Sequence, residues 1–408
     1  MQIAYDIVII GAGPAGLGFA ASMLDTNVNV LILERSDLED ISMPKVDGRE
    51  VALTHLSLKI LKKLGVWDLV DQTTVSPLRE AKVFDGDSPS LLNFKSDKAN
   101  IDALGYLVPN HKIRQALYNR VKDAKNITIQ TNTLADDVIQ LENSAQVVLV
   151  GGECIETKLV IAADSRFSSI RRKVGIPTLM KDFSKVMIIT KMMHEKSHEN
   201  IALECFDYGR TLALLPMIGD ASSVVLTVKT DESKKILEMN EAEFNEMITS
   251  SFKASLGEMT QSGERHSYPL VATHAQTFIA KRFALIGDAA VGMHPVTAHG
   301  YNLGLRGQDI LATLIKEALE HGQDIGSSSL LKLYEKKHIN LTRLMFFGTN
   351  GIVALFTNDA PVIKQVRKMV LKFAENFPPI KYLISNQLTE AKSNKFAPFE
   401  KILKKLPF

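Results

Sequence analysis

The sequence is poor in cysteine, in tryptophan and in net charge. Its 408 residues include two cysteines and one tryptophan, and the formal net charge is only +2. Cys154 and Cys205 follow neither a CxxC nor a metal-ligand spacing, so we expect packing residues in a reducing compartment rather than a disulfide or a metal site. The balanced charge argues against a general nucleic-acid binder, which carries a large basic excess.

The sequence also lacks export and membrane-spanning signals. Its first residues, MQIAYDIVIIGAG, lead into a predicted strand without a basic segment or a small-residue cleavage site. No uninterrupted apolar run reaches the roughly 18 residues that cross a bilayer. We therefore expect a cytoplasmic protein.

The chain is too long for one ordinary core, which predicts two domains with appendages.

What the sequence does contain begins with the stretch YDIVIIGAGPAGLGFAASMLDTNVNVLILERS. The continuous apolar run 7–10 is typical of a parallel strand buried on both faces. Gly11, Gly13 and Gly16 follow in GxGxxG spacing, which allows a tight turn, a close approach to a pyrophosphate and tight packing of helix on strand. Glu34 closes the next strand, where a carboxylate accepts ribose hydroxyl groups. Together these features predict dinucleotide binding.

A second stretch, GDAAVGMHPVTAHGYNLG at residues 287–304, favours FAD over NAD. Asp288 follows a short apolar run that reads as a strand, and open α/β sheets bind ligands at this end of their strands. Its carboxylate can bond a hydroxyl chain such as the ribitol of a flavin. The helix predicted to start at residues 300–302 offers free N–H groups to the edge of the flavin ring. The alternative is that Asp288 is only a helix N-cap.

These stretches resemble the class A flavoprotein aromatic monooxygenases, which have the p-hydroxybenzoate hydroxylase fold. The chain carries three fingerprints of that family in order: GAGPAG, IAADSRFSSIRRKVGI with Asp164 and Arg171, and GDAAVGMHP. The stretches DGREVALTHLSLKILKKLGVWD, GYLVPNHKIRQAL and TNGIVALFTNDAPVIKQVRKMVLKF resemble its ubiquinone-biosynthesis hydroxylase branch. Within that branch, GDAAVGMHPVTAHGYNLGL is most similar to the UbiM-type members. A single tryptophan excludes the paired-tryptophan motif of flavin halogenases.

The resemblance implies an α/β fold, in which a Rossmann-like FAD/NAD(P)-binding domain carries an inserted antiparallel-sheet substrate domain and C-terminal helices. The FAD-binding domain is expected at 1–75, 100–180 and 275–340, the substrate domain at 76–99 and 181–274, and a helical region at 341–408. The residues expected to bind FAD are Gly11, Gly13, Ala15, Gly16, Glu34, Arg35, Arg49, Arg114, Asp164, Asp288, Pro295, Ala298, Gly300, Tyr301 and Asn302.

The resemblance places two further groups of residues near the flavin ring. Leu214 and Pro216, in GRTLALLPM, are expected to line the substrate pocket. The family needs no side-chain nucleophile, so no catalytic residue is assigned, and Pro295, His294 and His299 are the only candidates in the flavin loop. For the two histidines we favour a structural role over a tuning role. Ser165 stands where most members have glycine, which puts nicotinamide nucleotide binding in doubt.

The inserted segment is expected to form an antiparallel sheet with a single polar helix. Four apolar stretches between residues 185 and 230 read as strands, and NEAEFNEMITSSFKASLG reads as the helix. The stretch AKVFDGDSPSLLNF reads as a hairpin that joins this sheet from an earlier part of the chain. Such a sheet would cover the flavin.

By resemblance the protein is an FAD-dependent monooxygenase. It would hydroxylate the aromatic ring of a polyprenylated phenol or benzoquinol on the way to ubiquinone, through a flavin C4a-hydroperoxide. O2 is then the co-substrate, and NAD(P)H or a redox partner is the electron donor. Two alternatives remain: an FAD-dependent reductase of isoprenoid double bonds, and a non-catalytic FAD-binding subunit of a biosynthetic complex. No metal and no nucleic acid are expected.

The C-terminal end, AKSNKFAPFEKILKKLPF, is basic and aromatic. Residues 391–408 contain five lysines against one glutamate, interleaved with three phenylalanines. This composition suits an anionic membrane surface, and a frayed, solvated tail fits it equally well. A polyprenylated substrate favours peripheral contact with the inner membrane. Other ubiquinone-biosynthesis proteins are further expected partners.

Overall fold

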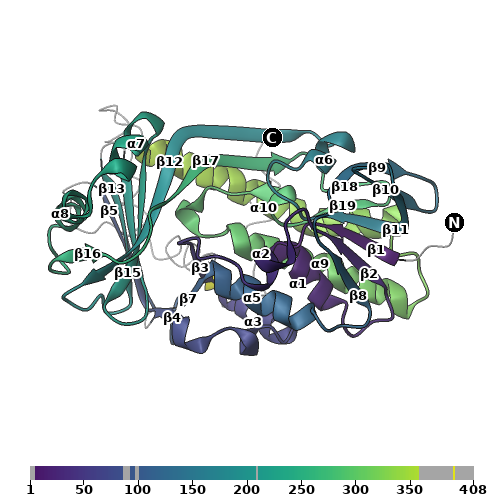
Figure 1. Cartoon of the computed structure of the whole chain (residues 1–408), viewed down its shortest axis with the longest axis horizontal. Coiled ribbons are helices and arrows are strands. Elements are labelled where there is room, and N and C mark those ends of the chain that lie inside the picture. Colours follow the sequence, from purple (N-terminus) through teal and green to yellow (C-terminus); the bar gives the residue numbers. More distant parts are fainter. Residues whose placement is uncertain (1–4, 86–91, 97–100, 208–209, 358–388, 391–408) are drawn as a thin grey trace, which may run out of the picture.

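The computed structural model describes residues 5–85, 92–96, 101–207, 210–357 and 389–390. Two large sheets stand at opposite ends of the molecule, and α10 (Ser328–Thr357) lies between them (Figure 1). The expected mixed α/β architecture is confirmed. The domain boundaries given above stay predictions.

The first sheet is mainly parallel at its centre. β1 pairs in parallel with β2 and β11, β11 pairs in parallel with β19, and β2 with β8. In spatial order its strands are β18 (Ile279–Ala280), β19 (Phe283–Leu285), β11 (Cys154–Ala162), β1 (Tyr5–Ile10), β2 (Val30–Leu33) and β8 (Ile127–Gln130), with β10 (Ala145–Leu149) and β9 (Ala135–Gln140) attached through β11. The predicted strand, turn, helix and strand at the N-terminus are thus present, with α1 (Pro14–Ser22) as the helix.

The second sheet is largely antiparallel. Its order is β20 (Val291–Gly292), β17 (His266–Ala275), β12 (Thr178–His194), β15 (Ala221–Lys229), β14 (Arg210–Pro216), β13 (Ile201–Asp207), β5 (Glu80–Asp85) and β6 (Leu92–Lys95), with β16 (Met259–Gln261) beside β12. β5 and β6 pair as the expected hairpin. β13 and β5 pair in parallel, unlike the expectation, because β5 comes from a distant part of the chain and no tight turn fixes its direction.

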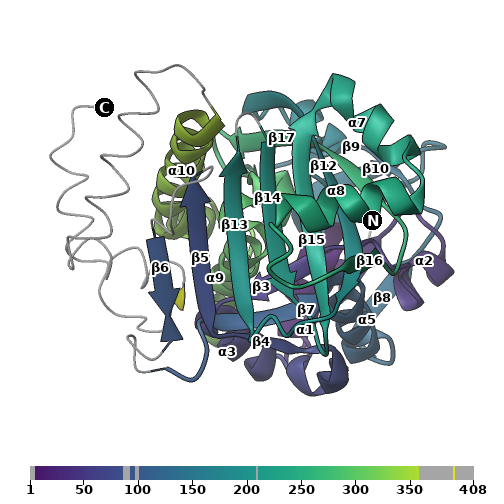
Figure 2. The same ribbon diagram turned by 90° about the vertical axis from the view of Figure 1, so that its left-hand side faces the viewer.

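Helices cover both sheets. A small sheet of β3 (Glu50–Leu53), β7 (Gly105–Pro109) and β4 (Ser76–Leu78) lies beside α3 and α5 (Figure 1). The other helices are α2 (Leu38–Ser42), α3 (His55–Lys63), α5 (Asn110–Val121), α6 (Ser169–Lys173), α7 (Thr230–Glu238), α8 (Glu241–Ser251) and α9 (Gly300–Glu320). α7 and α8 lie in front of the second sheet in Figure 2. α7 is an addition to the single helix expected in this segment: it follows β15 directly and begins at Thr230, the last residue of the predicted strand.

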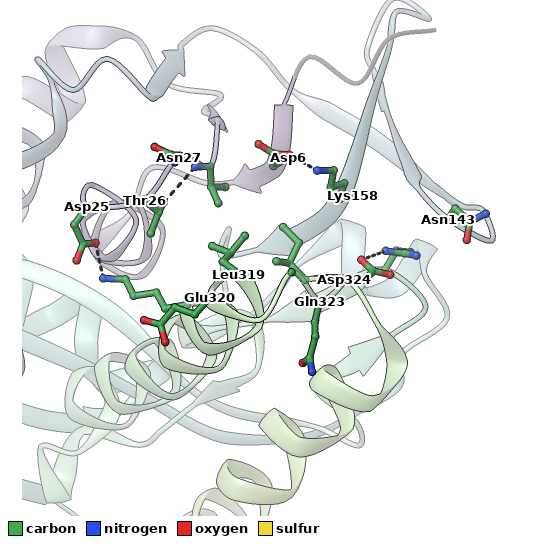
Figure 3. A pocket seen from close by; sticks show the side chains of 15 residues that line it. Asp6, Asp25, Thr26, Asn27, Asn143, Lys158, Leu319, Glu320, Gln323 and Asp324 are labelled. Atoms are coloured by element: carbon green, nitrogen blue, oxygen red, sulfur yellow. Dashed lines mark hydrogen bonds and ion pairs between the residues drawn. The ribbon is translucent and has the colours of Figure 1, made fainter.

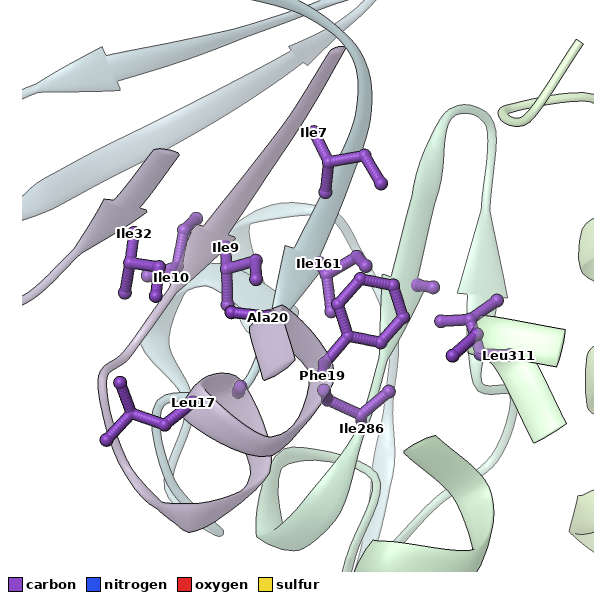
Figure 4. Packing of buried hydrophobic residues seen from close by; sticks show 14 of the residues in the cluster. Ile7, Ile9, Ile10, Leu17, Phe19, Ala20, Ile32, Ile161, Ile286 and Leu311 are labelled. Carbon is purple, nitrogen blue, oxygen red and sulfur yellow. The ribbon is translucent and has the colours of Figure 1, made fainter. Parts of the chain in front are cut away.

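The main core lies between the first sheet and its helices. Ile7 and Ile9 of β1, Phe19 of α1 and Leu311 of α9 are fully buried and point toward one another (Figure 4). A second core joins the second sheet to α7 and α8, and the partly buried Cys205 packs against it. Cys154 is exposed, so the expectation that both cysteines are packing residues is wrong for Cys154.

Among the described residues, α10 is long and apolar enough to cross a membrane, by length and composition only. A third of its most apolar window is buried. Tyr334 of α10 is fully buried and donates a hydrogen bond of 2.7 Å to the carbonyl oxygen of Leu285 in the first sheet. The N-terminal half of α10 is therefore a core helix. Residues 358–388 and 391–408, including the basic end, lie outside the described residues.

Candidate functional site

Four of the predicted site residues follow the carboxyl ends of parallel strands in the first sheet. Gly11 follows β1, Glu34 follows β2, Asp164 comes two residues after β11, and Asp288 three residues after β19. Because these four strands run in parallel, their carboxyl ends lie at one edge of the sheet. That edge is where open α/β sheets bind their ligands.

The glycine-rich turn is shaped by close backbone packing. Gly11 has φ of +109°, and a Cβ there would lie 2.7 Å from the carbonyl oxygen of Ala163. A Cβ on Gly16 would overlap the carbonyl oxygen of Gly11. A Cβ on Gly13, by contrast, would have no described heavy atom within 4 Å outside its chain neighbours. The turn is therefore closed on the protein side and open at Gly13, directly before the first N–H groups of α1.

The second motif packs against the first, although more than 270 residues separate them. A Cβ on Gly287, which has φ of +58°, would lie 2.6 Å from the Cβ of Ala15 in α1. On its other side Gly287 is in close contact with α9, because a Cβ on Gly304 of α9 would lie 3.2 Å from the Cα of Gly287. The start of α1, the turn carrying Asp288 and the first turns of α9 thus meet at one place.

The carboxylate of Glu34 is fixed by backbone groups. Its Oε2 accepts a hydrogen bond of 2.7 Å from the N–H of Ala12, and its Oε1 accepts one of 2.9 Å from the N–H of Ser36. The acid expected to receive ribose hydroxyl groups is therefore held against the glycine turn. The neighbouring Arg35 is exposed.

Asp288 is not an N-cap, so that alternative is wrong. It lies inside a short 3-10 helix, Gly287–Ala289, whose N-cap position is Ile286. The Asp288 carboxylate accepts hydrogen bonds from the Nε and Nη2 atoms of Arg166, at 3.1 and 2.7 Å, and remains half-exposed. Arg166, two residues after Asp164, was not among the predicted site residues, although it lies inside the middle fingerprint.

Arg171 connects the middle fingerprint to the Asp288 turn. Its side chain is 2% exposed, and its guanidinium donates to the carbonyl oxygens of Ala289 at 2.8 Å and Arg166 at 3.0 Å. The N–H of Arg171 in turn donates to Ser168, the N-cap of α6. Arg171 therefore fixes the relative position of two loops that the sequence separates by more than 100 residues.

Several polar atoms at this edge are buried without a hydrogen-bond partner among the described residues. They include Oδ1 of Asp164 and the hydroxyl oxygen of Tyr301. Burial raises the pKa of the Asp164 carboxyl and also that of the Tyr301 hydroxyl. Buried polar atoms of this kind are costly unless a water or ligand satisfies them. Together with the open space at Gly13, they fit a polar ligand along this edge.

The loop before α9 contains two buried histidines, His294 and His299. His294 Nδ1 accepts a hydrogen bond of 3.2 Å from the N–H of Val296. The His294 ring packs edge-on against the ring of Phe183, with ring centres 4.7 Å apart. Burial, assisted by Lys185 and Arg166, lowers the pKa of His294 to about 4, so the ring is neutral at pH 7. Pro295 begins the short helix η4 (Pro295–Thr297), and His299 is buried before α9. The contacts of His294 favour its structural role.

Ala298 and Asn302 hold this loop against β3. Ala298 has φ of +52° and donates its N–H to the carbonyl oxygen of Pro295 at 2.7 Å. The Asn302 amide donates to the carbonyl oxygens of Ala298 and Ala52 and accepts from the N–H of Thr54. The Asn302 side chain is thus fully used within the protein. At the start of α9 the backbone N–H groups of residues 300–302 can then face a ligand.

The two arginines expected near FAD have different surroundings. Arg49 pairs with Asp47 at 2.6 Å, lies 5.4 Å from the ring centre of Tyr268 and is close enough to Asp288 to interact with its charge. Arg114 donates to the carbonyl oxygen of Asp40 in α2 at 3.2 Å. Arg49 therefore borders the Asp288 turn, and Arg114 borders α2.

The expectation that Leu214 and Pro216 line the substrate pocket is corrected by the structure. Leu214 is buried in the core beneath α7 and α8, and Pro216, two residues along the same strand, points to the same side. Strand side chains alternate with a period of two, so Ala213 and Leu215 face the opposite side. The sequence motif predicted the strand correctly. The register was wrong by one residue, so the wrong face of the strand was assigned to the substrate pocket.

A large open cavity lies away from this edge. It has a volume of about 840 Å³ and is lined by Asp6, Lys158, Lys316 and Asp324 among others, with ion pairs between Lys158 and Asp6 and between Lys316 and Asp25 (Figure 3). Asp6 is at the amino end of β1, so this cavity is at the opposite edge of the sheet from Gly11. It contains none of the predicted site residues, and its volume alone does not make it the functional site.

Comparison with known proteins gives concordant results. Residues 4–345 match the family model described as FAD binding domain. The chain is 45% identical over 393 residues to the ubiquinone hydroxylase UbiM of Neisseria meningitidis, covering 95% of this chain and 85% of that protein. It is 31% identical over 378 residues to the ubiquinone hydroxylase UbiL of Rhodospirillum rubrum, covering 93% and 88%. The crystal structure of p-nitrophenol 4-monooxygenase PnpA from Pseudomonas putida superposes with a TM-score of 0.76 at 17% identity, over 95% of this chain and 99% of that one.

Proposed function

The chain belongs to the FAD-binding-domain family, and from that membership we propose that it hydroxylates the aromatic ring of a polyprenylated phenol or benzoquinol in ubiquinone biosynthesis. It is an FAD-dependent monooxygenase that uses O2 as co-substrate, with NAD(P)H as the electron source. The 45% identity to a ubiquinone hydroxylase supports this substrate class. Reduced FAD supplies the oxygen-activating chemistry when it is bound.

The packing of the Gly287 turn on Ala15 carries the proposal, because it brings both flavin fingerprints to one edge. In our proposal the open turn at Gly13 and the start of α1 hold the pyrophosphate, and Glu34 holds the adenosine ribose. Asp288 holds the ribitol chain, and the backbone N–H groups at 300–302 face the ring edge. The remaining FAD-binding residues predicted from the sequence keep their proposed roles.

The protein's own share of the chemistry is positioning and the exclusion of water. The buried side chains of His294, His299 and Asn302 anchor the segment 294–302, which would limit the freedom of the ring that it holds. A closed, dry site limits the unproductive loss of oxygen as hydrogen peroxide. Orientation of the substrate ring then supplies much of the rate. No side chain is required as a nucleophile.

Expression in a strain that lacks its own ring hydroxylases tests the proposal. We expect one ubiquinone intermediate to disappear and a product one oxygen atom heavier to form, as measured by mass spectrometry of the quinone pool. A Gly13→Ala variant, which loses FAD in our proposal, is the matched control. An unchanged quinone pool would refute the hydroxylase assignment. Reduced isoprenoid chains would indicate the reductase instead, and bound flavin without oxygen consumption a non-catalytic subunit.

We further propose a cytoplasmic protein in peripheral contact with the inner membrane, through residues 391–408. Their five lysines and three phenylalanines suit an anionic surface. We expect the full chain to co-sediment with vesicles that contain phosphatidylglycerol, and a chain ending at residue 390 to lose most of this binding. Binding should weaken with salt, because the lysines act through screened charge. Equal co-sedimentation of both chains would refute the role of the tail.

A further inference from the structure

The second sheet has one covered face and one accessible face. On β14 and β15 the side chains of Leu212, Leu214, Val224 and Leu226 are buried against α7 and α8. We call the opposite side the inner face. Its residues Glu204, Ala213, Leu215 and Val225 are all partly exposed, although they lie in the middle of the sheet. The inner face is therefore incompletely covered at these four positions, although Ile189 of β12 and Phe206 of β13 on the same side are buried.

Glu204 stands in an apolar row across this inner face. Strand pairing places it beside Val83 of β5 and Ala213 of β14, and Ala213 is beside Val225, which is beside Ile189 of β12. Paired residues on adjacent strands point to the same side of a sheet. Glu204 is thus the one polar member of a row formed by Val83, Glu204, Ala213, Val225 and Ile189.

The inner face is turned toward the flavin loop, by which we mean residues 294–302, the loop expected to lie against the flavin ring. Phe206, two residues after Glu204 on the same strand and face, contacts Phe356 of α10 with ring centres 4.1 Å apart. Val296 of η4, next to Pro295, packs in the same cluster. At the other end of the row, a Cβ on Gly48 would lie 3.5 Å from Ile189. The row therefore spans the region between the flavin loop and the segment that precedes β3.

From this geometry, and resting on the proposed function, we propose that the Glu204 carboxyl is the polar group that binds the ring hydroxyl of the aromatic substrate. The apolar row supports the face of the ring, and Glu204 fixes its rotation through a hydrogen bond. An apolar wall with one polar group gives orientation and specificity in small-molecule sites. A ring without a hydroxyl would cover the partly buried carboxyl without giving it a hydrogen-bond partner, which costs affinity.

The protonation state of Glu204 agrees with this role. Burial raises the pKa of Glu204 to about 8, so the carboxyl is neutral at pH 7 and can both donate and accept a hydrogen bond. The described residues next to Glu204 are apolar: Val83 and Ala213 are on the adjacent strands, Ala202 and Phe206 are on its own strand, and Val296 and Phe356 pack in the cluster of Phe206. Lys191 of β12, two residues after Ile189, is a charged residue on the same face at the far end of the row. Above pH 8 the ionised carboxylate can no longer donate, but it still accepts a hydrogen bond from the ring hydroxyl and finds no donor in a ring ether. The preference for a phenol over its methyl ether is therefore expected to grow as the pH rises through about 8.

Glu50 provides a matched control. Burial, and after it the charge of Asp47, raise the pKa of Glu50 to about 8, while Lys191 of β12 opposes this. Glu50 is in β3 rather than in the row, so our proposal gives it no contact with the ring hydroxyl. A pH effect that arises from Glu50 would disappear in Glu50→Gln and persist in Glu204→Gln.

The test compares two probes, 2-geranylphenol and its methyl ether 2-geranylanisole, which lacks the hydroxyl hydrogen. Their dissociation constants for the FAD-loaded protein are measured by calorimetry between pH 6 and 9. At pH 9, where Glu204 can only accept, we expect the wild type to prefer the phenol by about tenfold, as one buried hydrogen bond gives. This preference should be smaller at pH 6.5, because the neutral carboxyl can also donate to the ether oxygen. Glu204→Gln, which donates and accepts at every pH, should keep the smaller preference across the whole range, and Glu204→Leu should lose it.

Several outcomes would overturn the proposal. They are a phenol preference that survives in Glu204→Leu, a pH dependence that survives in Glu204→Gln, and the absence of any preference in the wild type. FAD content and thermal unfolding show whether each variant is folded, and Glu204→Gln keeps the side-chain volume if Glu204→Leu fails to fold. A wild type that hydroxylates quinone intermediates but shows no preference refutes only the role of Glu204. A wild type that binds the phenol but leaves the quinone pool unchanged refutes only the proposed function.

Discussion

Replacing Gly16 with alanine is expected to prevent the accumulation of folded, flavin-containing protein. The added methyl group would overlap the carbonyl oxygen of Gly11 and lie 3.2 Å from the Cγ2 atom of Ile9. Gly11 cannot move aside, because it has φ of +109° and is in close contact with Ala163. Overpacking a rigid core typically costs about 1–3 kcal/mol, and here the clash is with a backbone atom that no rotamer change relieves. Soluble yield, thermal unfolding and absorbance at the flavin band measure the effect.

Gly13→Ala is the matched control for this experiment. Gly13 has φ of −73°, which alanine adopts freely, and no described heavy atom outside its chain neighbours lies within 4 Å of the new methyl group. We expect unfolding of the apo form to be unchanged and FAD affinity to fall at least about tenfold, because the methyl group blocks the approach of the pyrophosphate. Unchanged FAD affinity would contradict the proposed cofactor position. Normal folding of Gly16→Ala would contradict the packing of the turn.

Arg171→Met is expected to produce the largest loss of stability among single side-chain truncations at this edge. The guanidinium is 2% exposed and bonds the carbonyl oxygens of Ala289 and Arg166. Methionine fills part of the volume but leaves both carbonyl oxygens unpaired, and disruption of such a buried charged network costs about 3 kcal/mol. The midpoint of urea unfolding, followed by circular dichroism, measures this. The two loops should also separate, so FAD affinity should fall as well.

Arg172→Met provides the comparison, because Arg172 is the next residue of α6 and is exposed. Both substitutions remove one positive charge from the same helix, so they share any general charge effect. We expect Arg172→Met to change stability by no more than about 0.5 kcal/mol. If the two variants unfold at the same urea concentration, the hydrogen bonds of Arg171 do not hold the loops together.

Local patterns were sufficient to predict the first βαβ unit. The apolar run 7–10, the glycine spacing and Glu34 lie within about 30 residues, and steric rules for tight turns and buried strands act over that range. The structure shows β1, α1 and β2 in these positions. The same holds for the β5–β6 hairpin. The prediction for Leu214 was wrong because it depended on which face of β14 the side chain occupies. An error of one residue in the register of a strand places a side chain on the opposite face.

The contacts that join the motifs could not be predicted in the same way. The pairing of Arg166 with Asp288 links residues 122 positions apart, and nothing in either local pattern specifies the partner. The bonds of Asn302 to Ala52 and Thr54 likewise cross some 250 positions. The contact of Arg166 with Asp288 depends on the placement of β11 beside β1 and of β19 beside β11 in the sheet. That placement follows from burial of the whole core rather than from any short stretch.

The sequence by itself determined which segments carry flavin-type motifs, because the turns and helix starts that make those motifs are governed by interactions among near neighbours. Only the tertiary structure decided that Gly287 packs on Ala15, that Arg171 ties two loops together and that Glu204 faces the flavin loop from an apolar row. These facts depend on strand order and strand face. Both are set by the packing of the two sheets as a whole.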